Sequence, residues 1–363
     1  MSRLQNFIAH WRDIGEMRIA PRYLIIFLFP VIVLITAEYL LGNYGDHALD
    51  LSHVALAQHD TLGELAGRYR YMAAVFFYLA VSVSLILVFA FELGSQHKLL
   101  SILSTVVALF AAVGVALVFS ILEPVQMNSF ESYQLLGESL YRRALGVGKL
   151  AGCGAETPMN GDCLKGGAFN ALIQLNGTVN IVSALASASV IAGMILALSR
   201  SGPVDLETRE GLLQEAKALE ASQAATRRYL YASGILLTVG MSMGLAWMNW
   251  PNALIVDDAT RDMHGKLVDG VSLFRGVSYS VLIMSYYLPV SLVLMVRTNT
   301  FHAAAEAHGS DITPKELEAW DARIGGFDIN KIASLDAMKA ILAIVSPILT
   351  SALGSFGSLT GFG

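Results

Sequence analysis

The sequence predicts an all-α, polytopic membrane protein with six transmembrane helices and both termini inside, assembled as a homo-oligomer. Apolar residues make up 55% of the 363-residue chain and charged residues 15%, whereas an ordinary soluble domain carries about 25% charge. The apolar residues also occur in nearly uncharged blocks of about 20, the helix length that crosses a bilayer. Because a soluble fold of this size cannot bury so much hydrocarbon, the composition excludes a soluble enzyme, a nucleic-acid-binding protein and a disordered chain.

Six blocks have the length and apolarity of a span, and each is expected to be helical because backbone amides in lipid must bond to one another. These blocks cover residues 22–41, 71–93, 99–122, 172–198, 229–250 and 271–296. The first is not expected to be a cleavable signal peptide, since five more spans follow it and it lacks a small-residue cleavage site. The predicted membrane domain is therefore 22–298, with outer loops 42–70, 123–170 and 251–270.

The distribution of Lys and Arg predicts the orientation. With the N-terminus inside, 15 of the 24 Lys and Arg residues lie on the inner side and 8 on the outer side. Basic residues also stand directly at the proposed inner ends, where the positive-inside rule has most weight. These are Arg22, Lys98, Arg200, Arg228 and Arg297. We therefore expect an integral protein of the plasma (inner) membrane with both termini cytoplasmic.

Both cysteines, Cys153 and Cys163, lie in the outer loop 123–170. The residues between them include Gly154 and Pro158, turn formers that can bring the two thiols together. An oxidising compartment would join them, so a disulfide is predicted. Two free thiols, or half of a metal site, are the alternatives.

The segments outside the spans have their own patterns. Residues 1–21 contain an amphipathic helix that lies in the inner leaflet or packs on the protein's inner surface. Its apolar face is formed by Leu4, Phe7, Ile8, Trp11 and Ile14. Residues 199–228 are expected to form a charged helix that continues into the fifth span. Residues 299–363 form a cytoplasmic segment whose uncharged tail, 340–363, is either a seventh span or a tail packed on the inner mouth or on a neighbouring subunit.

Catalytic and nucleotide-binding signatures are missing from the sequence. There is no phosphate-binding glycine loop, no H-E-x-x-H and no G-x-S-x-G, so an enzyme is not predicted and no cofactor is expected. The histidines of the first outer loop, His47, His53 and His59, are six residues apart and would point to different faces of a helix. A shared metal site is therefore not expected.

Ionisable residues inside the spans are informative because burying a charge in lipid is costly. Glu38 lies near the outer end of the first span and Arg275 near the outer end of the sixth, and their matching depth predicts an ion pair that braces the two helices. Glu92, at the inner end of the second span, is expected to reach the interface or Lys98. No ionisable residue lies at the midplane, which argues against a proton- or sodium-coupled carrier.

The fourth span combines a polar face with an apolar inner end. Its polar side chains are spaced by four, three and four residues, which places them on one helix face. They are the pore-lining candidates Asn176, Asn180, Ser183 and Ser187. The aliphatic residues below them could form a dewetting gate. The gate candidates are Ile191, Ile195 and Leu198. The alternative is a tightly packed interior helix whose Asn and Ser side chains bond across its contacts.

The leading functional hypothesis is an oligomeric, weakly selective ion channel gated from the cytoplasmic side. One polar stripe per chain cannot enclose a conduit, so several copies must surround an axis. A cytoplasmic ligand or partner protein would open it, and acidic residues of the outer side would favour cations. These acids are Asp257, Asp258, Asp262 and Asp269. Such a pore could serve as the membrane-depolarising effector of a stress or defence system.

Two other classes of function stay open. One is a small-molecule secondary transporter, with its substrate held by polar side chains of the fourth and sixth spans. Those side chains are Asn176, Asn180, Tyr279 and Tyr286. The other is a non-conducting membrane scaffold or assembly factor whose inner segment recruits a partner. In each case the lipid bilayer is the surrounding partner, and permeating ions are expected only for the channel.

Overall fold

The computed structural model describes residues 28–41, 53–57, 62–95, 168–198, 205–307 and 335–359, with a few isolated positions besides. Its regular elements are α2 (Leu28–Leu40), α3 (Leu62–Ser95), α7 (Ala168–Leu196), α8 (Arg209–Asn249), η5 (Trp250–Leu254), α9 (Asp258–Ala307) and α11 (Leu335–Leu359). Within these ranges every element is helical, apart from one β-bridge between Leu56 and Ile255. The all-α prediction is confirmed for this part of the chain.

Four of these helices, α3, α7, α8 and α9, are long and apolar enough to cross a membrane. They cover the predicted second and sixth spans completely and the fourth and fifth except for their last two and one residues, which supports a membrane-embedded protein. Helix α2 lies within the predicted first span but has only 13 residues. The predicted third span, the amphipathic segment 1–21 and both cysteines lie outside the described residues. The count of six spans and the orientation therefore stay predictions.

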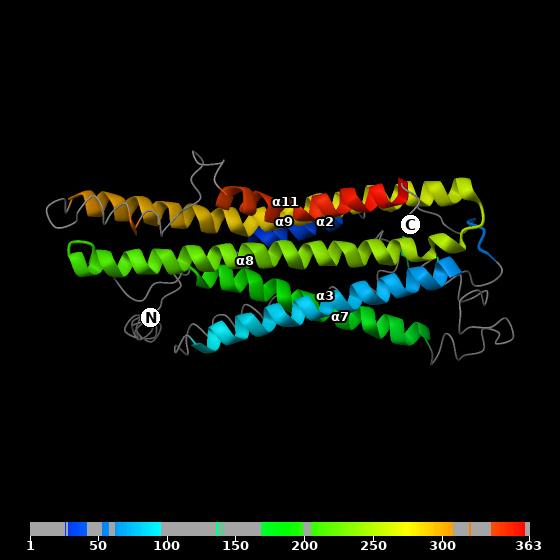
Figure 1. The fold of residues 1–363 in the computed structure, drawn as a ribbon, viewed down its shortest axis with the longest axis horizontal. Coiled ribbons are helices and arrows are strands. Elements are labelled where there is room, and N and C mark those ends of the chain that lie inside the picture. Colours follow the sequence, from blue (N-terminus) through cyan, green and yellow to red (C-terminus); the bar gives the residue numbers. More distant parts are fainter. Residues whose placement is uncertain are drawn as a thin grey trace, which may run out of the picture.

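Helices α8 and α9 form a long antiparallel hairpin closed by η5 (Figure 1). They have 41 and 50 residues, or roughly 60 and 75 Å at 1.5 Å per residue, about twice the hydrocarbon thickness of a bilayer. Helix α8 runs without interruption from the charged stretch into the predicted fifth span, which confirms the continuity expected from the sequence. We call the end of the hairpin away from η5, residues 209–222 and 297–307, the extension.

The extension has an apolar core separate from that of the rest of the bundle. Its members are Leu212, Ala216, Leu219, Phe301 and Ala305, with Leu206, Ala304 and Trp320 packed against them. The Phe301 and Trp320 rings lie 5.7 Å apart. Thr208 caps the start of α8 by accepting a hydrogen bond from the Gly211 amide. The extension is thus a folded unit, and the two long helices carry it.

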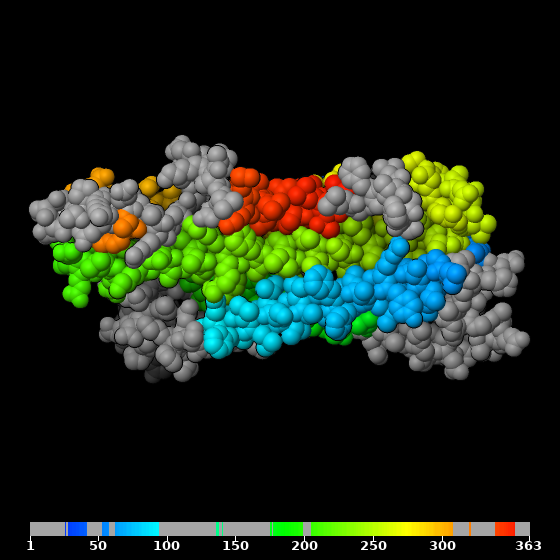
Figure 2. Space-filling view, in the orientation of Figure 1, coloured from blue at the N-terminus to red at the C-terminus, as the bar shows by residue number. Residues whose placement is uncertain are grey.

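Helix α8 is the centre of the bundle and packs against α3, α7, α9 and α11, whereas α2 packs on α9. Figure 2 shows α11 (red) and α3 (blue to cyan) on either side of α8 (green). Near η5, the Tyr71 ring lies 4.9 Å from Trp247 and 5.6 Å from Trp250. This aromatic cluster fixes α3 to the closed end of the hairpin.

Helix α11 lies along the hairpin in close contact with α8 and α9 (Figure 1). Its Ser346 hydroxyl is 3.5 Å from the Gly234 carbonyl of α8. A Cβ at Gly276 of α9 would be 2.9 Å from the Pro347 carbonyl oxygen, so only glycine permits this approach. Small residues are typical of helix contacts in membranes. The apolar tail therefore runs beside the predicted fifth and sixth spans instead of covering their inner ends.

Candidate functional site

The polar face predicted for the fourth span lies on α7 and is half-buried at Asn180, Ser183 and Ser187. The Ser183 hydroxyl donates to the Asn180 carbonyl at 3.1 Å, and it also shares a hydrogen bond with Tyr78 of α3. Asn176 lies in the first half of α7, and its side chain is outside the described part. Within one chain, the stripe thus runs beside α3, partly accessible and partly engaged by it.

The predicted gate residues are packed inside the chain. Ile195 and Leu198 are each 1% exposed, and Ile191 is half-buried. The first two belong to an apolar cluster with residues of α8 and α9. In this conformation, therefore, neither side chain faces an axis between copies. A gate at these positions requires the inner end of α7 to move.

The carboxyl end of α7, which the sequence predicts to be its inner end, is held by a junction of three helices. At Gly193 of α7 an added Cβ would overlap the ring of Tyr229, which begins the predicted fifth span on α8. The Tyr229 hydroxyl donates to the Glu92 carboxylate of α3, and Arg228 forms an ion pair with the same carboxylate. The Arg228 guanidinium carbon also lies 5.6 Å from the Tyr229 ring centre. We call these four residues the inner junction.

The sequence analysis placed Glu92 at the inner end of the second span, and the structure adds two partners from α8. The expected alternatives were the interface and Lys98, and Lys98 lies outside the described residues. The partners that the structure shows are Arg228 and Tyr229. An acid and a base at the inner ends of two spans were the available signal. The role of Gly193 could not be found from sequence, because it depends on which ring lies opposite.

Near the other end of the bundle, Arg275 of α9 forms an ion pair with Glu38 of α2, the partner that matching depth predicts. The second guanidinium nitrogen lies 3.3 Å from Glu38 Oε2, so the pair is bidentate. The side chains are 14% and 26% exposed. This geometry joins a short helix, α2, to the long hairpin.

A second acidic side chain, Glu64, was not singled out from the sequence. It lies in the first turn of α3, seven residues before the predicted span, and is fully buried. Its Oε1 atom accepts from the Trp250 indole at 2.8 Å and from Arg68 Nη2 at 2.8 Å. This contact holds α3 against η5 at the closed end of the hairpin.

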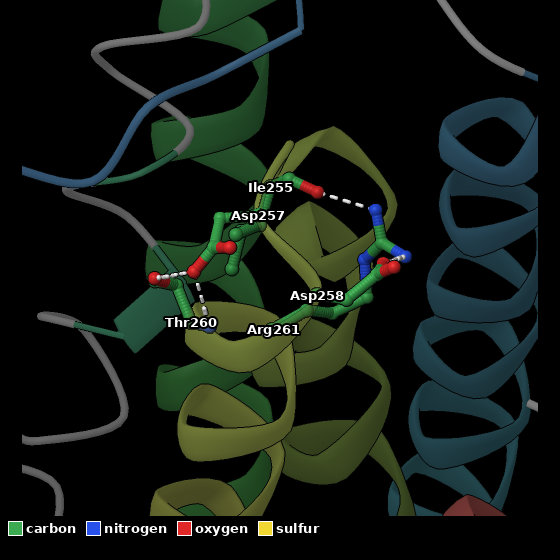
Figure 3. A network of polar contacts seen from close by, with 5 residues as sticks. All are labelled: Ile255, Asp257, Asp258, Thr260 and Arg261. Carbon is green, nitrogen blue, oxygen red and sulfur yellow. Dashed lines mark hydrogen bonds and ion pairs between the residues drawn. The ribbon is translucent and has the colours of Figure 1, made fainter.

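Most of the outer acids expected to attract cations are engaged locally (Figure 3). Asp257 accepts from the Thr260 amide and hydroxyl at 2.8 and 2.6 Å, and these hydrogen bonds lower its pKa. Asp258 pairs with Arg261 at 2.8 Å, and Asp262 pairs with Lys266. These contacts cap and stabilise the start of α9. They also reduce the negative field that the sequence assigned to this surface.

The extension contains a buried ion pair that sequence reasoning missed. Arg297 of α9 approaches Glu215 of α8 at 3.2 Å, and their side chains are only 6% and 2% exposed. In the sequence, Glu215 lies in a charged stretch and resembles any solvated helix residue. Only the packing of α8 against α9 shows that it is enclosed.

Comparisons with protein-family models, with curated proteins and with solved structures find no match for this chain. Its function therefore has to be argued from its own residues.

Proposed function

We propose that the chain forms an oligomeric, weakly selective ion channel in the plasma (inner) membrane, closed in this conformation and gated from the side of the extension. The observation that carries the proposal is the division of α7: a half-buried polar face leads directly into apolar residues that are almost fully buried. Polar groups hold water in a pore, and an apolar constriction stops conduction by dewetting. Several copies must meet so that their α7 polar faces border one path.

Control from the extension follows from the continuity of α8. Between residues 212 and 233 this helix has neither glycine nor proline, the two residues that most weaken a helix interior. A displacement of the extension by a cytoplasmic ligand or partner would therefore reach the α7 contact. Because Asp257, Asp258 and Asp262 are locally engaged, selectivity among ions is expected to be weak.

Conductance of the purified protein in planar bilayers tests this proposal. Discrete current steps are expected, and Ile191→Asn should increase the open fraction because an amide hydrates the constriction. Ile181→Asn is the matched control, since Ile181 lies on the same helix but is 36% exposed and away from the proposed gate. A conducting protein in which both variants behave like wild type would place the gate elsewhere, and a monomer that does not conduct would remove the proposal.

A second candidate is a non-conducting membrane scaffold that recruits a partner through the extension. The burial of Ile195 and the Ser183–Tyr78 contact favour it, because both use the α7 stripe for packing within one chain. Absence of current together with co-purification of a fixed partner, lost when the extension is disrupted by Phe301→Asp, would support the scaffold over the channel.

A further inference from the structure

The geometry points to the inner junction as a latch: Tyr229, held by Glu92 and Arg228, keeps the inner end of α7 against α8. This inference rests on the proposed channel function and names how the same site is regulated. Three helices meet at one side chain here, so a change at any of them alters the position of the other two.

The contact with α7 is steric. The Tyr229 ring lies directly against Gly193, where no side chain larger than hydrogen fits. The ring is 4% exposed and belongs to the same apolar cluster as Ile195 and Leu198. Because interiors are close-packed, these two gate candidates cannot leave the cluster while the ring stays in place.

The contact with α3 is polar. The Tyr229 hydroxyl and the Arg228 guanidinium both approach the Glu92 carboxylate, and hydrogen bonds to a charged acceptor are stronger than neutral ones. The Glu92 side chain is 24% exposed and that of Arg228 54%, so this part of the junction is reachable from the adjacent surface. The contact between the Tyr229 ring and Gly193 is buried, whereas the Glu92 carboxylate is accessible and can change its partners.

The connection to the extension is the backbone of α8. Fourteen residues separate Tyr229 from Glu215 along one uninterrupted helix, and Glu215 fixes α8 to α9 through Arg297. Rotation or sliding of the extension would therefore move Arg228 and Tyr229 away from Glu92. Loss of that contact frees the ring and, with it, the inner end of α7.

Thiol labelling of Ile195→Cys with a membrane-permeant maleimide tests the latch without requiring conduction. Labelling is measured on the full-length protein above that of the protein without the added cysteine, so that Cys153 and Cys163 are accounted for. Adding Tyr229→Phe, which keeps the ring and removes the hydroxyl, should raise the labelling rate about tenfold. Tyr231→Phe, two residues along the same helix, is the matched control and should leave the rate unchanged.

Two further variants test the polar and the steric contact of the latch separately. Glu92→Gln keeps an acceptor for the phenol but removes the ion pair, and should give a smaller increase than Tyr229→Phe. Gly193→Ala should force the ring aside and give the largest increase if the protein folds. Labelling at the wild-type rate in both Tyr229→Phe and Glu92→Gln would overturn the latch. Faster labelling without any current would support the latch and overturn the channel.

Discussion

In the described part of the chain, helix α9 makes two arginine ion pairs with other helices, one on each side of its middle. These two pairs differ in burial and in how well the sequence reveals them. Arg275 meets Glu38 with side chains 14% and 26% exposed, whereas Arg297 meets Glu215 with 6% and 2%. The first pair stands out because its members interrupt apolar blocks. In the more deeply buried pair, Glu215 lies among other charged residues while Arg297 follows an apolar block, so the sequence does not show that the two meet. Charge is thus informative where the surroundings are apolar, and uninformative where they are mixed.

The largest effect is expected from breaking the buried pair. Glu215→Gln leaves the Arg297 charge without this counter-charge in a closed site, and loss of one partner of a buried pair costs about 3–5 kcal/mol. Thermal unfolding and protease cleavage within the extension would measure the loss. Glu220→Gln, an exposed acid on the same helix, is the control, and equal effects of the two changes would contradict the comparison. The double variant Glu215→Leu, Arg297→Leu should recover much of the stability.

A smaller loss is expected from Gly276→Ala at the α11 contact. The new Cβ would be 2.7 Å from Ser351 Oγ and 2.9 Å from a backbone oxygen, and overpacking of this kind costs about 1–3 kcal/mol. Gly265→Ala on the same helix meets nothing within 4 Å, so it should stabilise α9 by up to about 1 kcal/mol. Thermal stability in detergent measures both changes, and a stabilising Gly276→Ala would show that α11 is not held there.

Breaking the half-buried pair of Glu38 and Arg275 should cause the next smaller loss of stability. Glu38→Gln is expected to cost about 1.5 kcal/mol, the lower value for a hydrogen bond to a charged group. Asp262→Asn breaks the exposed pair with Lys266, in which the side chains are 63% and 73% exposed, and should change stability by less than about 1 kcal/mol. The same unfolding assay measures the loss of stability for all three pairs. If the loss does not increase with the burial of the pair, the comparison is wrong.

The smallest effect is a pH dependence at His264, a buried side chain of α9 near the hairpin tip. Burial of the imidazole lowers the pKa of His264. The folded state therefore prefers neutral imidazole. Its contribution to stability is present above the unfolded pKa of about 6.5 and is lost as the pH falls below that value, by at most about 1.4 kcal/mol per pH unit. Melting temperatures at several pH values should show a weaker acid-side decline in His264→Gln than in wild type.

Much of the helical architecture could be predicted because long apolar blocks leave the chain few alternatives in lipid. The helix ends were less predictable: α3 begins nine residues before its expected span, since Glu64 is buried against Trp250 and not solvated. The Gly240–Gly244 spacing is a membrane packing signature. A Cβ at Gly240 would lie 3.2 Å from the Tyr78 ring, yet one at Gly244 would meet nothing within 4 Å. Gly193 and Gly276, with no G-x-x-x-G spacing, make closer contacts than either of them.

In the candidate site, too, some features could be predicted from the sequence and others could not. The polar and apolar parts of α7 follow from helical periodicity, and the Glu38–Arg275 contact follows from depth. The partner of Gly193 and the enclosure of Glu215 depend on which helices are neighbours, and periodicity carries no information on that. A gate that seals a conduit and a packed core both require apolar side chains. The identities of Ile195 and Leu198 therefore could not show which of these two roles they have.

The direction of α11 has a consequence for where the end of the chain emerges. Helix α11 runs with its carboxyl end toward the side on which η5 turns the chain around (Figure 1). Along the way it meets α8 at Gly234 through residue 346 and α9 at Gly276 through residue 351. This direction fits the alternative in which the tail is a seventh span, and with the amino end inside that alternative would carry the carboxyl end to the opposite compartment. An epitope fused after Gly363 would accordingly be detected by antibody on unpermeabilised spheroplasts.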